Sequence, residues 1–123
     1  MRAAPTPLVR VSADRTRTDQ DLLAVEAPLL LRVTDDRRSI VVPLGVLLRT
    51  PGDDEDLVRG LLFTEGIIRD ADELLTLSLR REAAAEGAEG EVADVTLASS
   101  VDLPAIAGTR ALPLTTSACG LCG

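Results

Sequence analysis

The chain has 123 residues, enough for one domain with a buried core. Hydrophobic residues make up 46% and charged residues 27%, a balance typical of globular proteins. The net charge of −7 and the single aromatic residue argue against general nucleic-acid or membrane-surface binding, which depends on basic surfaces and on aromatic stacking for single strands. The sequence has no run of about 20 apolar residues that would span a membrane.

The first part of the chain is expected to form an arm and two strands. Residues 1–20 are polar, and we expect an arm there with a short strand at 8–11. Apolar and polar residues alternate over 29–33, which predicts a half-buried strand. A second β segment is expected over 40–48, where Pro43 favours an edge position or a bulge because proline cannot donate a ladder hydrogen bond.

One main helix is expected near 54–65. Asp53 is its candidate N-cap, and Gly66 is the candidate C′ residue that ends it. The acidic run 53–56 is interpreted as helix capping and a solvated surface rather than as a metal site. One face of the helix is expected to pack on the strands, and it carries Leu57, Val58, Leu61 and Leu62.

Two further strands are expected near 74–80 and 92–98, joined by a hairpin loop over 82–91. From Ser99 the periodicity is weak, and we expect an extended tail. The order β-β-α-β-β predicts an α+β fold with a small, mostly antiparallel sheet. We divide the chain into a polar arm (1–20), an α+β domain (21–114) and a C-terminal loop (115–123).

The C-terminal loop holds the two cysteines of the chain, Cys119 and Cys122. This Cys-x-x-Cys spacing keeps the sulfurs close, so one thiol can stabilise or attack a sulfur carried by the other. A zinc site needs about four N or S ligands, and the chain has no histidine to complete one. Haem attachment requires a histidine where Gly123 stands. The pair is interpreted as reactive sulfur, with no metal and no permanently bound cofactor.

Four segments carry a resemblance to a known family. They are LAVEAP (23–28), RTPGDD (49–54), GLLFTEGII (60–68) and TSACGLCG (116–123). In this order and at this spacing they resemble the formate dehydrogenase accessory sulfurtransferase family (FdhD-type).

The resemblance implies a cytoplasmic sulfurtransferase that acts as a sulfur carrier. A cysteine desulfurase would load persulfide sulfur on the Cys-x-x-Cys loop. The sulfur would then pass to the molybdenum (or tungsten) bis-guanine-dinucleotide cofactor that formate dehydrogenase needs. By motif match, Cys119 and Cys122 are the catalytic pair, with Cys119 as the first acceptor. The implied partners are therefore the desulfurase, the dehydrogenase and the cofactor, and a homodimer is a further option.

The resemblance also implies a second, cytidine-deaminase-like domain that supplies most of the nucleotide pocket. The sequence stops one residue after Cys122. We therefore expect an N-terminal portion of such a protein, able to accept sulfur but not to deliver it, and we assign no cofactor-binding residues. Two alternatives stay open: a docking module without chemistry for a dehydrogenase or desulfurase, and a redox dithiol protein.

Overall fold

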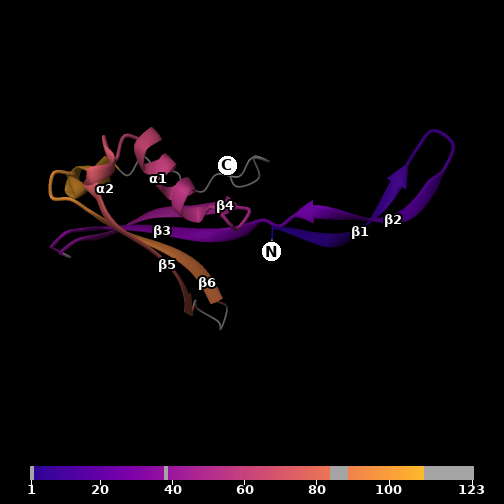
Figure 1. The fold of residues 1–123 in the computed structure, drawn as a ribbon, viewed down its shortest axis with the longest axis horizontal. Coiled ribbons are helices and arrows are strands. Elements are labelled where there is room, and N and C mark those ends of the chain that lie inside the picture. Colours follow the sequence, from indigo (N-terminus) through magenta and orange to yellow (C-terminus); the bar gives the residue numbers. More distant parts are fainter. Residues whose placement is uncertain (1, 38, 84–88, 110–123) are drawn as a thin grey trace.

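The structure, a computed structural model, describes residues 2–37, 39–83 and 89–109. These residues form an α+β fold that consists mostly of strands, with one main helix, as predicted (Figure 1). In chain order the elements are β1 (Ala3–Val11), β2 (Thr16–Ala24), β3 (Ala27–Asp35), β4 (Val41–Arg49), α1 (Asp54–Thr64), a short 3-10 turn (Ala71–Glu73), β5 (Leu74–Ala83), β6 (Glu89–Leu97) and α2 (Leu103–Thr109).

The main sheet has four strands in the order β4-β3-β6-β5. Two antiparallel pairs, β3 with β4 and β5 with β6, are joined through a parallel pairing of β3 with β6. With α1 between β4 and β5, this sheet has the predicted order β-β-α-β-β. β4 is an edge strand, and its register with β3 shifts between Leu31 and Arg32. Pro43 therefore lies both on an edge and beside a bulge, as expected.

The core lies between this sheet and α1. Leu31 and Val33 of β3 are fully buried together with Val58 and Leu62 of α1. Burying one such side chain contributes about 1.5–3 kcal/mol. Leu57, expected on the packed face, is instead 39% exposed, because the buried stripe is centred on Val58 and Leu62 and Leu57 lies to one side of it.

Helix α1 begins after Asp53 and ends before Gly66, as predicted, but only Gly66 has the predicted role. Gly66 has φ +71 and follows the C-cap residue Glu65, whose N–H donates to the carbonyl of Leu61. Asp53 occupies the N-cap position, but its side chain makes no capping hydrogen bond. Its carboxylate instead accepts a hydrogen bond from Arg2.

Residues 1–20 were expected to form a polar arm with a short strand, but from Ala3 onward the chain forms a long antiparallel hairpin of β1 and β2. Its register pairs Ala3 with Ala24 and Val11 with Thr16, so β2 continues across residue 20. The hairpin extends away from the main sheet (Figure 1). Its threonines, aspartates and arginines masked the strand periodicity, because both faces of an exposed hairpin can be polar.

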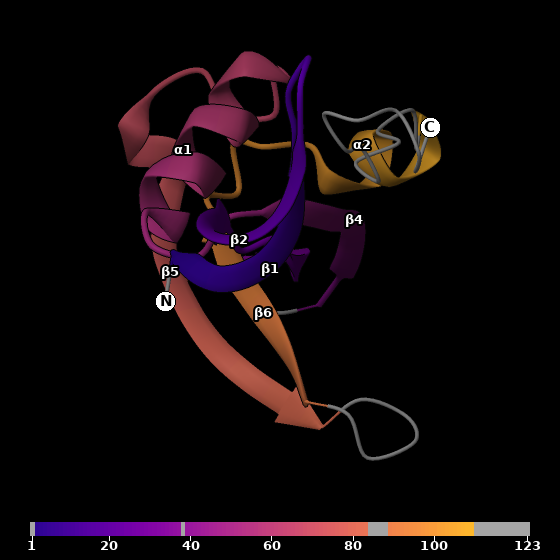
Figure 2. The same ribbon diagram turned by 90° about the vertical axis from the view of Figure 1, so that its right-hand side faces the viewer.

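The expected extended tail after Ser99 contains a helix, α2. Asp102 begins it: its side chain accepts the N–H of Ala105 at 3.0 Å, and its carbonyl accepts the N–H of Ile106. Pro104 is tolerated because it lies in the first turn. Leu103 is buried in the core, so α2 is attached to the same side of the sheet as α1, as Figure 2 shows. No helix in the described residues is long and apolar enough to cross a membrane.

Candidate functional site

The two cysteines predicted to carry sulfur, Cys119 and Cys122, lie outside the described residues. Both follow α2 in the sequence, so the described residues form the scaffold that precedes them. Within that scaffold, the most deeply buried polar group is an arginine at the base of the hairpin. We build the candidate site from this group outward.

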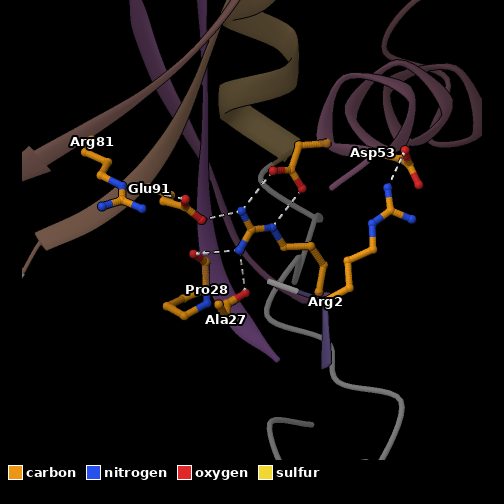
Figure 3. Close-up of polar contacts among 8 residues, drawn as sticks. Arg2, Ala27, Pro28, Asp53, Arg81 and Glu91 are labelled. Carbon is orange, nitrogen blue, oxygen red and sulfur yellow. Dashed lines mark hydrogen bonds and ion pairs between the residues drawn. The ribbon is translucent and has the colours of Figure 1, made fainter. Parts of the chain in front are cut away.

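Arg49 is the last residue of β4, and its side chain is 6% exposed. It pairs with Ala27 at the start of β3, where the chain leaves the hairpin and enters the main sheet. Oxygen atoms from the sheet and from the start of α1 surround the guanidinium, and the sheet residues that supply them, Ala27, Pro28 and Glu91, are labelled in Figure 3. The group therefore lies where the hairpin, the sheet and the helix meet.

The guanidinium uses all three of its nitrogens. Nε and Nη2 donate to the two carboxylate oxygens of Asp54, at 2.9 and 3.0 Å. Nη1 donates to the carbonyl of Ala27 at 3.0 Å, and Nη2 also donates to Glu91 of β6. This fork geometry is specific to arginine. The contacts hold the first turn of α1 against β3 and β6.

The electrostatics of this cluster favour a permanently charged arginine. Burial lowers the pKa of Arg49, but the hydrogen bonds that Arg49 donates to the carboxylates of Asp54 and Glu91 outweigh it, and the net pKa is raised. A group that stays protonated cannot serve as a general acid or base near neutral pH. The cluster is therefore suited to positioning rather than to proton transfer.

A second ion pair joins the start of the hairpin to the start of α1. Arg2 Nη2 lies 2.9 Å from Asp53 Oδ1, and both side chains are largely exposed (Figure 3). Gly52 has φ +148, and a Cβ there would lie 2.5 Å from Nε of Arg2. Glycine is needed at this position for its backbone conformation, whereas the exposed end of the Arg2 side chain could move away from a Cβ.

A polar cluster lies on β3, β6 and β5, away from Arg49. Arg32 donates two hydrogen bonds to Asp94, at 2.8 and 2.9 Å, and two to Glu82, at 2.9 and 3.1 Å. The bonds from Arg32 lower the pKa of Asp94 despite its partial burial, and Arg80 lowers it further. Threonine and serine side chains line the surface around the cluster.

Two shallow pockets lie near α2. A mainly apolar one of about 400 Å³ is lined by β4 and by Ile106 and Ala107 of α2. One of about 430 Å³ with a mixed polar and apolar lining lies between the end of β3 and residues 99–104. Small-molecule sites range from about 300 to 1,000 Å³. Both pockets are at the lower end, so neither encloses a ligand as large as a bis-dinucleotide.

The chain is similar in sequence to known sulfur carrier proteins. No protein-family model matches the chain. The sulfur carrier proteins FdhD of Mycobacterium bovis and Mycobacterium tuberculosis are each 42% identical to it over 92% of its length, and that of Streptomyces avermitilis is 38% identical over 94%. This chain is homologous to a portion of the FdhD sulfur carriers. It spans about 40% of the length of these FdhD relatives.

The fold has a counterpart among solved structures. A crystal structure described as a formate dehydrogenase accessory protein from Desulfotalea psychrophila matches 79% of this chain and 35% of its own, with a TM-score of 0.53. The two sequences are 18% identical, so this likeness concerns the fold alone.

Two of the four segments that resemble FdhD meet at Arg49. Segment 49–54 supplies Arg49 and Asp54, and segment 23–28 supplies the carbonyl of Ala27. Sequence reasoning missed this arginine as a structural centre and interpreted Asp54 as part of a solvated surface. The sequence pattern that could have predicted this ion pair is an arginine at the end of an apolar strand, followed by an acidic first helical turn.

Proposed function

We propose that this chain takes part in sulfur transfer, with Cys119 and Cys122 as the persulfide-carrying pair. The observation that supports this most strongly is its 42% identity to FdhD sulfur carriers over 92% of its length. The chain contains no other thiol, so any sulfur bound as a persulfide must be held at these two positions.

The chemistry needs only a thiolate and a sulfur donor. The thiolate of one cysteine attacks the outer sulfur of a persulfide on a cysteine desulfurase. A new S–S bond forms, the old S–S bond breaks, and the desulfurase cysteine leaves as a thiolate. We assign Cys119 as the first acceptor because it lies nearer the folded scaffold in sequence, and Cys122 as the thiol that attacks or shields the carried sulfur.

We further propose that the sulfur is passed, in the cytoplasm, to the molybdenum (or tungsten) bis-guanine-dinucleotide cofactor of a formate dehydrogenase. The support is the resemblance to the formate dehydrogenase accessory family. The cofactor is cargo in this scheme and not a resident group. The role of the described residues is to hold a rigid scaffold ahead of the cysteines, through the Arg49 cluster and the core beneath α1.

The test is a loading reaction with a cysteine desulfurase and free cysteine, followed by intact-mass measurement. Each transferred sulfur adds about 32 Da and is lost again on reduction. Cys119→Ala should remove most of the loading, Cys122→Ala should leave part of it, and the double variant should abolish it. Ser117→Ala, beside the motif, is the matched control and should load normally.

The outcomes separate the three candidate functions. A sulfur carrier gains mass, whereas a redox dithiol loses about 2 Da on oxidation without gaining sulfur. A docking module binds the desulfurase and keeps its mass. Loading that persists in the double variant, or that fails in the wild type while the desulfurase turns over, contradicts the proposal.

A further inference from the structure

A shallow, mainly apolar groove lies between β4 and α2. It has a volume of about 400 Å³ and is lined by residues 40–44 at the start of β4 and by Ile106 and Ala107 of α2. Val41 in this lining is 59% exposed, although valine normally favours burial. β4 is an edge strand of the main sheet, so no further strand of the described residues pairs with it on this side. The groove therefore exposes apolar surface, and covering that surface would stabilise the fold.

The core fixes the position of α2 beside this groove. Leu103 is 1% exposed, and Ile106 packs against the buried cluster of the main sheet and α1. Figure 2 shows α2 next to β4. The helix ends at Thr109, two residues after Ala107 of the groove lining. The chain therefore leaves the described scaffold next to the groove.

The residues that follow α2 match the groove in their lack of charge. Residues 111–123 contain no charged side chain, in a chain in which 27% of the residues are charged. The other long run without charge, residues 39–48, contains the β4 side of the groove. Packing these two segments together would therefore bury no charge, which is the costliest part of covering a protein surface.

The segment Leu112-Pro113-Leu114 has a pattern that suits such a groove. A proline disfavours the helical conformation of the residue before it, so Leu112 is expected to be extended. In an extended chain, alternate residues project to the same side, so Leu112 and Leu114 are expected to share one face. Pro113 between them has no N–H, so docking leaves no unpaired donor there.

The tether between α2 and this segment is short. Leu112 follows Thr109 by three residues, which span at most about 10 Å when extended. A segment tethered this closely has an effective concentration of the order of millimolar at its docking site. An apolar segment of another protein would have to compete with it. The chain's own segment is therefore the favoured occupant of the groove.

We propose that Leu112 and Leu114 dock in the groove between β4 and α2 and fix the base of the cysteine loop there. Residues 110–123 lie outside the described residues, so the support comes from the groove, the tether and the sequence. Cys119 follows Leu114 by five residues and would lie within about 17 Å of it. The docking does not depend on whether the cysteines carry sulfur.

Disulfide trapping tests the docking. Cys119→Ser and Cys122→Ser remove the native thiols, and Val41→Cys with Leu112→Cys places one new thiol on each side of the contact. A disulfide requires Cα atoms about 4.4–6.8 Å apart. Under mild oxidation at about 5 µM protein, far below the effective concentration of the tether, we expect an intramolecular bond. The bond lowers the intact mass by about 2 Da.

The matched control for trapping lies on the opposite edge of the same sheet. Leu75 of β5 is 50% exposed, so Leu75→Cys with Leu112→Cys offers a thiol of similar accessibility away from the groove. We expect the Val41 pair to form its disulfide at least about tenfold faster than the Leu75 pair. Equal rates would overturn the proposal. A disulfide between two chains in the Val41 pair would show that a second copy occupies the groove, and it would overturn the proposal too.

Trypsin cleavage after Arg110 provides an independent check with both native cysteines present. Val41→Asp places a charge at the groove and should release the segment, so cleavage should become several-fold faster. Leu112→Ser with Leu114→Ser should have the same effect, and Leu75→Asp, the control, should leave the rate unchanged. Far-UV circular dichroism should show the same fold in all variants, because Val41 and Leu75 are exposed. A cleavage rate that Val41→Asp does not change would contradict the docking.

Discussion

Arg49 and Asp54 form a bidentate ion pair, in which Nε and Nη2 of the arginine lie 2.9 and 3.0 Å from the two carboxylate oxygens. The pair connects the end of β4 to the first turn of α1 across the turn at 50–53. Asp54 also lies at the positive end of the helix dipole, where a carboxylate is favoured. One buried arginine therefore helps to fix the first turn of α1 on the sheet, in addition to the packing of Val58 and Leu62 in the core.

Replacing Arg49 should destabilise the fold strongly. Arg49→Met would leave Asp54, which is 13% exposed, without its cation, and breaking a buried pair in this way costs about 3–5 kcal/mol. Arg49→Lys should recover only part of the loss, because lysine lacks the planar fork. Urea unfolding measures the effect, with Arg59→Ala, at an exposed arginine of α1, as control at about 0.5 kcal/mol or less. A loss below 1 kcal/mol for Arg49→Met would show that the cluster does not hold α1 in place.

Gly52→Ala should destabilise the fold through its backbone conformation. A positive φ costs alanine about 1–3 kcal/mol. Arg2→Ala alone should cost less than about 1 kcal/mol, because its ion pair with Asp53 is exposed. The end of the Arg2 side chain is exposed and can move away from the new Cβ, so Gly52→Ala should cost about the same in the wild type and in the Arg2→Ala background when urea unfolding is compared. A clearly smaller cost in the Arg2→Ala background would show that Arg2 is held in place and that its contact with the Cβ matters.

Two leucines of α1 should respond differently to truncation. Leu62→Ala should cost about 2–5 kcal/mol, because Leu62 is fully buried and the change leaves a cavity. Leu57→Ala is the matched control on the same helix, and its effect should be much smaller because Leu57 is partly exposed. Thermal or urea unfolding compares the two. Similar losses for both variants would place Leu57 in the core after all.

Asp94 should make the free energy of unfolding depend on pH in the acidic range. The hydrogen bonds from Arg32 lower its pKa in the folded chain, so its contribution is present above the ordinary carboxyl value of about 4. That contribution is lost as the pH falls through the lower, folded value. Asp94→Asn should therefore reduce stability at pH 7 and flatten its decline between about pH 5 and 2. An unchanged slope in urea unfolding across this range would contradict the assignment.

The sequence predicted the elements that obey strong local rules. The alternation in β3 and the apolar spacing of α1 were sufficient, as was Gly66 at the helix end, because each reflects burial or a backbone requirement at a single position. Only a short strand at 8–11 of the β1–β2 hairpin was predicted, because few of the hairpin's side chains are buried and its pattern carries little hydrophobic signal. The parallel pairing of β3 with β6 was also missed, because strand order depends on long-range packing.

The candidate site, too, could be predicted from the sequence only in part. The Cys-x-x-Cys motif stands out in sequence because both thiols of the chain lie together, and its role stays a prediction. The Arg49 cluster could not be assembled from sequence, because it joins residues from four elements, β3, β4, α1 and β6: Ala27, Arg49, Asp54 and Glu91. Its parts look like ordinary surface charges until the fold brings them together.

The central claim is that sulfur is carried on the C-terminal cysteines, and peptide mapping of the loaded protein tests it most directly. After reaction with a desulfurase and cysteine, alkylation and digestion with trypsin, cleavage after Arg110 releases residues 111–123 with both thiols. The account predicts about 32 Da of added sulfur on this peptide, absent from the double cysteine variant. An unmodified peptide 111–123 from a reaction in which the desulfurase is active would contradict it.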